Sequence, residues 1–244
     1  MKDINLKRYN VIKYSLIIFC CLFYMAIATL LLTKSYLPKG SKISAVVAIQ
    51  IAGVLVTILP LIFEKIFKLK YTIWAWIIYL SFCVLSMGIG SGLGMYNIIS
   101  FYDFILHFCS GVVISFLTYA IFCKHINKNL SLKSQLFYTF LFALCFTVLI
   151  GVLWEVWEFS FDHFFNLNSQ RHTDLNGNAL LGHTALIDTM LDLIADTLGA
   201  FLTGGALSLF YLLKKQEPKN LFTFKPNNNL TEEKINEIKI EKEE

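Results

Sequence analysis

The sequence predicts an all-α membrane protein, a polytopic bundle of six transmembrane helices with both termini in the cytoplasm. Of its 244 residues, 56% are hydrophobic and only 16% are charged, and the mean hydropathy is +0.61. Soluble domains contain about 45–50% apolar and about 25% charged residues, so these charges are too few to cover a water-soluble surface. The apolar residues also gather in long runs rather than in short amphipathic segments.

Six windows reach the length of about 20 mostly apolar residues that a spanning helix needs. They are residues 14–33, 43–63, 72–90, 101–123, 135–159 and 186–213. We expect the first window to be retained as a helix, because it is too long for a signal peptide and lacks a small-residue cleavage site. Residues 1–213 then form one transmembrane domain, and the polar segment 214–244 is predicted to be a disordered cytoplasmic tail.

The basic residues beside the predicted spans indicate the orientation. Fourteen Lys and Arg residues flank the spans on one side and four on the other. Because positive charge accumulates on the cytoplasmic side, both termini are expected inside and residues 163–185 outside. The formal charge of +4 does not indicate nucleic-acid binding, since the lysines are spread over short connectors. The six cysteines lie in apolar runs without a CxxC pair and are interpreted as small hydrophobic residues.

Ionisable side chains within three predicted spans are the main functional signal. Such groups are costly in a membrane, which makes them functional hypotheses by default. They recur at helical spacing with a glycine on the same face. They are Asp103 and His107 in the fourth span, Glu155 and Glu158 in the fifth, and Asp188, Asp192 and Asp196 in the sixth. The topology puts them in the outer part of the membrane, with Asp196 about 12 Å deeper than Asp188 at ~1.5 Å per residue.

This acidic cluster requires positive charge. Six carboxylates and one imidazole cannot all be ionised close together, and Arg171 is the nearby outer cation. Either several carboxylates are protonated, or one or two metal ions lie among them. Oxygen ligands suit Mg²⁺, Mn²⁺ or Ca²⁺, and a histidine among them also permits Zn²⁺ or Fe²⁺. Alternatively, single members cap helix ends or form hydrogen bonds within the bundle.

We therefore treat the seven residues as candidate metal ligands. Six of them, Asp103, His107, Glu155, Glu158, Asp188 and Asp192, are also candidate catalytic residues. Arg171 is the candidate substrate-binding residue, because a guanidinium can grip a phosphate or a carboxylate. The glycine pairs within residues 87–94 favour tight helix packing over a phosphate-binding loop.

Three segments resemble the YjdF-like family of bacterial inner-membrane proteins. The segments are Tyr102-Asp103-x3-His107-Phe108-x2-Gly111, Trp154-Glu155-x2-Glu158, and Asp188-Thr189-x2-Asp192 with Gly199-Ala200. The resemblance implies an architecture and a location in the bacterial cytoplasmic membrane, but no reaction. Asp103/His107, Glu155 or Glu158, and Arg171…Asp188…Gly199 are more distantly similar to the VanZ-like family, which is linked to glycopeptide resistance. The Asp188-x3-Asp192 spacing also matches part of the CDP-alcohol phosphotransferase signature, but the rest of that signature is missing.

Two classes of function follow from these observations. One is a membrane enzyme that acts on a lipid or lipid-linked phosphate at the outer leaflet, with the carboxylates holding a divalent metal ion. The other is a non-enzymatic lipid- or drug-interacting protein, or a proton-coupled carrier, whose acidic cluster binds a cationic headgroup or protons. The sequence leaves open the substrate, the oligomeric state and whether the protein catalyses a reaction.

Overall fold

The computed structural model describes residues 6–33, 43–66, 70–123, 125–165, 168–174, 177–218 and 223–224. Within them, six helical stretches are long and apolar enough to cross a membrane, which confirms the predicted helical bundle. The long helices are α1 (Leu6–Leu32), α2 (Ile43–Ile66), α3 (Ile73–Cys83), α5 (Tyr102–Phe122), α6 (Leu132–Phe165) and α7 (Ile187–Lys214). The π-helix η1 (Val84–Gly92) continues α3, the short α4 (Met95–Ile98) follows it, and the 3₁₀ turn η2 (Gly182–Leu186) precedes α7.

The helix ends extend beyond several predicted windows. Helix α1 begins at Leu6, so Lys13 lies within the helix rather than ahead of it. Helix α6 covers residues 132–165, about two turns more than the apolar window 135–159. Hydropathy finds only the part of a helix that is apolar, whereas polar residues continue the same helix where partners satisfy them.

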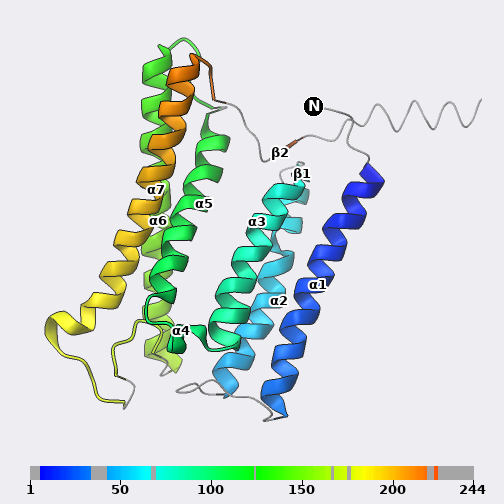
Figure 1. The fold of residues 1–244 in the computed structure, drawn as a ribbon, viewed down its shortest axis with the longest axis vertical. Helices are drawn as coiled ribbons and strands as arrows, with labels where there is room; N and C mark the ends of the chain where they lie inside the picture. Colours follow the sequence, from blue (N-terminus) through cyan, green and yellow to red (C-terminus); the bar gives the residue numbers. More distant parts are fainter. Residues whose placement is uncertain are drawn as a thin grey trace, which may run out of the picture.

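The bundle consists of two groups of three helices (Figure 1). The first group contains α1, α2 and α3 with η1, and its core is built around the fully buried Tyr24 and Trp76. The second group contains α5, α6 and α7. Helix α5 provides most of the contact between the groups, through α3, α4 and η1. The glycines of η1 serve helix packing, as predicted: Gly88 faces the Phe23 ring and Gly92 faces Gln50.

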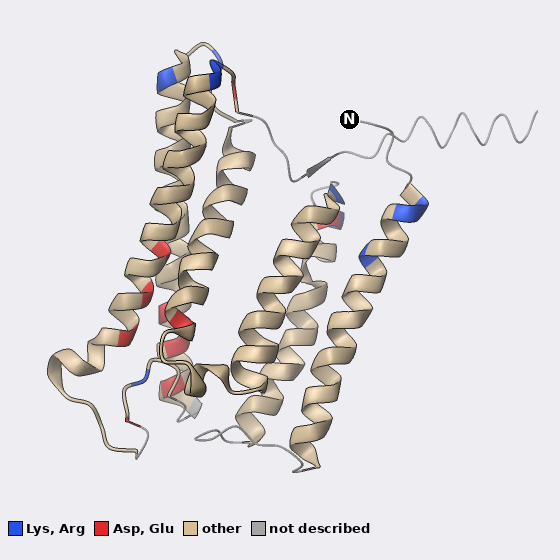
Figure 2. Ribbon diagram, viewed as in Figure 1, with Lys and Arg blue, Asp and Glu red and all other residues tan. Residues whose placement is uncertain are grey.

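The two ends of the bundle carry opposite charges (Figure 2). Among the described residues, the lysines of α1, α6 and α7 lie at the end where α1 starts and α7 stops. The acidic residues of α5, α6 and α7 lie toward the opposite end (Figure 2), and Arg171 pairs with two of them. This separation is what the predicted topology requires, and the orientation itself stays a prediction.

Most of the predicted tail lies outside the described residues, namely 219–222 and 225–244. Between these segments, strand β2 (Thr223–Phe224) pairs antiparallel with β1 (Lys70–Tyr71), which precedes α3.

A buried ion pair joins the first three helices near the lysine-rich end. Lys13 Nζ of α1 donates to Glu64 Oε2 of α2 at 2.9 Å. Lys13 is fully buried, with 0% of its surface exposed. Glu64 Oε1 also accepts from the Tyr9 hydroxyl at 3.1 Å and from the Trp76 indole at 3.2 Å. The backbone N–H of Tyr71 donates to Oε1 at 3.0 Å, and Lys70 Nζ donates to Oε2 at 3.3 Å. Glu64 of α2 thus accepts hydrogen bonds from side chains of both α1 and α3 and joins the three helices.

We expect Lys13→Met to destabilise the protein, because it leaves the buried Glu64 carboxylate without its closest cation. Removing one partner of a buried ion pair costs about 3–5 kcal/mol, and Lys70, which stays 3.3 Å from Glu64 Oε2, offsets part of this cost. Thermal melting in detergent would detect the remainder as a lower Tm. The double variant Lys13→Met/Glu64→Gln should melt higher than Lys13→Met alone. Lys7→Met, at an exposed position of the same helix, is the control. Equal Tm values for Lys13→Met and Lys7→Met would contradict the interpretation.

Candidate functional site

The site depends on a close approach of α5 and α7. A Cβ atom at Gly111 of α5 would overlap the backbone of Asp196 in α7. A Cβ at Gly199 of α7 would overlap the carbonyl oxygen of Phe108 in α5. Two glycines, one on each helix, therefore let the backbones touch, as small residues do between membrane helices.

This approach brings His107 of α5 against two aspartates of α7. His107 Nδ1 lies 3.1 Å from Asp196 Oδ2, within hydrogen-bond distance, and both residues are buried. The Ser110 hydroxyl contacts the other oxygen of Asp196. Gly151 of α6 makes room for this carboxylate, because a Cβ there would lie 2.6 Å from Asp196 Oδ2. All three helices of the second group thus shape the position of Asp196.

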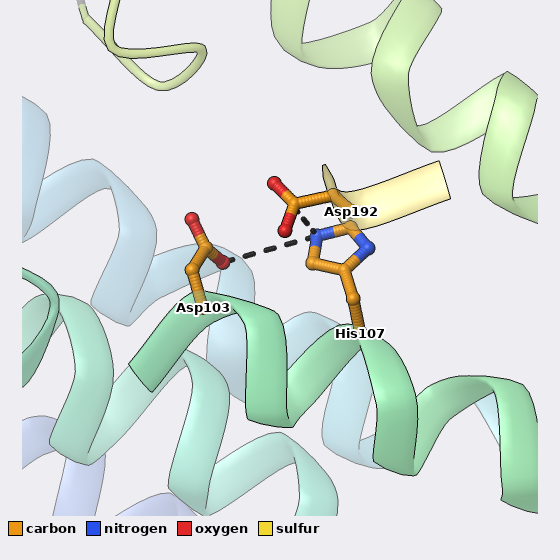
Figure 3. Close-up of side chains that lie close together, drawn as sticks. All are labelled: Asp103, His107 and Asp192. Carbon is orange, nitrogen blue, oxygen red and sulfur yellow. Dashed lines mark ion pairs between the residues drawn. The ribbon is translucent and has the colours of Figure 1, made fainter. Parts of the chain in front are cut away.

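The second ring nitrogen of His107 faces two other carboxylates (Figure 3). His107 Nε2 is 3.8 Å from Asp103 Oδ1 and 3.9 Å from Asp192 Oδ2. One ligand atom from each of these three residues can be chosen so that all lie within 4.8 Å of one another. Among the described residues, Asp103, His107 and Asp192 are the group that could hold a metal ion. Asp192 is 2% exposed, and its Oδ2 makes no hydrogen bond to a described residue.

Arg171 lies across the outer edge of this group. Its guanidinium is 3.4 Å from Asp103 Oδ2 and 3.2 Å from Asp188 Oδ1, and so links α5 to α7. It also contacts the backbone carbonyl oxygens of Tyr96 and Ser100. Its backbone has a φ of 47°, in the left-handed region. The cation predicted beside the cluster is therefore paired with two of its acidic residues, while its outer location stays a prediction.

Glu155 of α6 is buried beside this cluster and has one unused oxygen. Its Oε2 accepts from the Gln170 side chain at 3.1 Å, and the same amide nitrogen reaches the Thr189 hydroxyl at 3.1 Å. Its Oε1 is buried and makes no hydrogen bond to a described residue. Glu155 is 5% exposed, which makes an unpaired oxygen costly unless a ligand or a proton satisfies it.

Glu158 points to a different neighbourhood from Glu155. Its Oε1 accepts from the Trp154 indole at 3.0 Å. Together with Asp103, His107 and Asp196, its side chain lines a cavity between α6 and the first helix group. The structure thus brings Asp103, His107 and Asp192 into one compact group, while Glu155, Glu158, Asp188 and Asp196 surround it.

Several residues that position this cluster were not among the predicted site residues. Ser110 and Gln170 contact Asp196 and Glu155. Asp162, at the end of α6, accepts from the backbone N–H groups of Ser169 and Gln170 at 2.7 and 2.9 Å, and so fixes the loop that carries Arg171. The polar residues next to Arg171 were the available signal, but their partners lie on α6 and α7, and helix packing decides which of these side chains they reach.

Comparisons with known proteins agree with the membrane assignment. Residues 16–215 match the family described as "Predicted membrane protein (DUF2238)". A Thermotoga maritima protein named "Uncharacterized protein" is 32% identical over 143 residues, which is 58% of this chain and 66% of that protein. The chain thus spans slightly less than two thirds of this relative. No solved structure matches. The family match is consistent with the YjdF-like resemblance, and the VanZ-like resemblance stays a prediction from sequence.

The close approach of α5 and α7 can be tested by adding a single methyl group. Gly111→Ala should lower the Tm, because overpacking a tight contact costs about 1–3 kcal/mol. Gly205→Ala is the matched control, since a Cβ at that α7 position meets nothing within 4 Å and alanine favours a helix by about 0.5–1 kcal/mol. Thermal melting of both variants in the same detergent gives the comparison. A Gly111→Ala protein as stable as wild type would show that the helices do not touch at this point.

Proposed function

The chain belongs to the DUF2238 family of predicted membrane proteins, and within that family we propose that it binds a divalent metal ion and acts on a lipid phosphate. We place this site at the outer face of the bacterial cytoplasmic membrane, with both termini inside. The observation that carries the proposal is the group of Asp103, His107 and Asp192, which lies within membrane-spanning helices.

The spacing of this group suits one cation. Divalent ions bind imidazole nitrogen and carboxylate oxygen at about 2.0–2.5 Å. Ligand atoms 3.8 and 3.9 Å apart, as His107 Nε2 is from Asp103 and Asp192, can therefore flank a single ion. The buried Asp192 Oδ2, which has no hydrogen-bond partner among the described residues, supports this reading.

Asp196 supports the site in another role. If Nδ1–H of His107 donates to Asp196, the lone pair of Nε2 is directed toward Asp103 and Asp192. Metal-binding histidines usually donate their other ring N–H to a carboxylate or a carbonyl in this way. We therefore propose that Asp196 positions His107, in place of the direct ligand role that sequence analysis gave it.

The charge balance also favours a cation. The cluster contains six carboxylates, and the described cations that contact it are Arg171 and His107, the latter only when protonated. Carboxylates cannot all stay ionised in this environment without further positive charge. A divalent ion supplies two charges at the point where Asp103 and Asp192 converge.

With a metal bound, the surrounding residues would take distinct roles. The ion would polarise a phosphoryl oxygen of the substrate. Arg171, which now pairs with Asp103 and Asp188, would bind the phosphate once the metal holds Asp103. Glu155 has a buried oxygen without a partner among the described residues and is the proposed general base.

The second candidate function uses the same residues without a metal. Protons on several carboxylates would also balance the cluster, and the unpaired oxygens of Glu155, Asp188 and Asp192 are compatible with protonated groups. The protein would then be a non-enzymatic lipid- or drug-interacting protein or a proton-coupled carrier. Metal binding separates the two candidates.

We expect Mg²⁺, Mn²⁺, Zn²⁺ or Ca²⁺ to raise the Tm of the wild-type protein, and a chelator to lower it. A ligand at a hundredfold excess over its Kd stabilises by about 2.7 kcal/mol. Asp192→Asn should remove this response, because a neutral amide replaces one of the charged ligands in the group of Asp103, His107 and Asp192. The control Glu217→Gln, at an exposed position after α7, should keep it.

The opposite result would support the protonated cluster. In that case Asp192→Asn is close to isosteric with a protonated aspartate and should be neutral or stabilising. If neither the chelator nor any of the four ions changes the wild-type Tm, the protein does not bind a metal ion at this site.

Removing Arg171 should affect the metal and the phosphate in opposite directions. Arg171→Gln frees Asp103 and Asp188 from their cation, so the apparent Kd for the divalent ion should fall several-fold. Binding of a short-chain phosphatidic acid to the metal-loaded protein should weaken, because a charge-assisted contact worth about 1.5–3 kcal/mol is lost. Titration calorimetry in detergent measures both. A parallel weakening of both would indicate that Arg171 only holds the fold.

A further inference from the structure

A cavity reaches the acidic site from between the two helix groups. It has a volume of about 120 Å³, and its lining comes from α3, η1, α5 and α6, together with Tyr96 of α4 and Asp196 of α7. All of these elements except α4 belong to candidate membrane-spanning stretches. The cavity therefore lies at membrane depth.

The lining of the cavity combines apolar and polar side chains. Phe82, Leu106, Ile114, Ile150 and Trp154 line it with apolar surface. Polar groups of the acidic site gather along the rest of the lining, among them Asp103, His107, Glu158 and Asp196. Along α5, Ile114 lies seven residues beyond His107, which corresponds to about 10 Å at ~1.5 Å per residue. The lining thus matches an amphiphile whose polar headgroup lies near His107 and whose hydrocarbon part contacts the apolar side chains.

The cavity is open sideways. Among the described elements, α6 packs against α5 and α7 and hardly against α3 or η1, and α5 provides most of the contact between the two helix groups. Trp154, at the α6 wall, is 42% exposed. Phe82, Ile114 and Ile150 are half-buried. Because η1 and α6 both line the cavity without packing closely on each other, and both belong to candidate membrane spans, we infer that bilayer lipid can reach the cavity between them.

We propose that this cavity binds one hydrocarbon chain of a membrane lipid, which enters from the bilayer between η1 and α6. Its volume of about 120 Å³ approaches that of an apolar cavity of about 150 Å³ that holds a benzene ring. The site therefore takes a segment of a single chain and leaves the rest of the lipid in the membrane. A soluble phosphate would leave the apolar walls without a partner. The inference rests on the proposed function only for the contact between the lipid phosphate and the metal.

Chain binding can be mapped with a photoreactive lipid. The full chain is placed in phosphatidylcholine vesicles that contain phosphatidic acid with a diazirine on one acyl chain, and the labelled residues are identified by mass spectrometry after irradiation. Ile150 should be labelled about fivefold more than its neighbour Leu149, because a chain seated in a pocket stays there longer than bulk lipid. Leu149 is 51% exposed on the same helix at the same depth, and it does not line the cavity.

Filling the cavity gives the matched variants. Ile114→Trp should reduce the labelling of Ile150 about fivefold, because the indole occupies the space of the chain. Ile150→Trp fills the same space from α6, with labelling then read at Ile114. Leu149→Trp should leave the labelling of Ile150 unchanged. The Tm rise with divalent ions should persist in all three variants, which shows that the acidic site is intact.

The outcomes separate this inference from the proposed function. Equal labelling of Ile150 and Leu149 in the wild-type protein overturns the chain site, and it does so even if a cavity-filling variant fails to fold. Labelling that survives Ile114→Trp also overturns it. Enriched labelling of Ile150 without any Tm response to divalent ions would support the lipid-chain site and contradict the metal site. A Tm response to divalent ions without enriched labelling of Ile150 would support the metal site and contradict the lipid-chain site.

Discussion

The backbone contact between α5 and α7 is the constraint on which the acidic site depends. Gly111 and Gly199 lie where a side chain would overlap the facing backbone. Because the helices meet there, His107 can reach Asp196 on one side of its ring, while Asp103 and Asp192 lie on the other. Helix α6 then completes the site through Gly151, which leaves space for the Asp196 carboxylate.

Two buried ionic clusters occupy opposite ends of the bundle and differ in how completely they are paired. At the lysine-rich end, Glu64 receives hydrogen bonds on both oxygens, from Lys13 and from aromatic and backbone donors. At the other end, Glu155, Asp188 and Asp192 each keep a buried oxygen without a hydrogen-bond partner among the described residues. A saturated cluster holds helices together, whereas an unsaturated one has capacity for a ligand. This contrast is the physical reason for assigning structure to the first cluster and function to the second.

Each of the two helix groups contains one of these ionic clusters. The first group packs around Tyr24, Trp76 and the Lys13–Glu64 pair. The second carries the acidic residues and the loop with Arg171, which Asp162 fixes to the end of α6. Their limited contact along α5 leaves the cavity between them, which is lined both by apolar side chains and by His107. In this arrangement a substrate that is half hydrocarbon and half phosphate can meet both environments at once.

The sequence alone determined the membrane class, the six helices and the residues of the acidic cluster. Apolar length and helical spacing are local properties, so hydropathy found each span, and the spacing of Asp103 with His107 and of Asp192 with Asp196 found each face. It also identified Arg171 as the cation of that end. Local patterns missed Lys13 as a buried residue, because its burial depends on Glu64, 51 residues away.

Only the tertiary structure decided which members of the cluster meet. The spacing treated seven residues as equivalent, whereas helix rotation and the glycine contacts bring Asp103, His107 and Asp192 together. The same packing places Asp196 beside the other ring nitrogen of His107, and it places Glu155 where its carboxylate accepts a hydrogen bond from Gln170. The cavity beside them is equally a tertiary property, since its walls come from helices that are distant in sequence. A one-dimensional pattern fixes the face of a helix on which a side chain lies, but the angle and distance at which two helices pack fix the atoms it reaches.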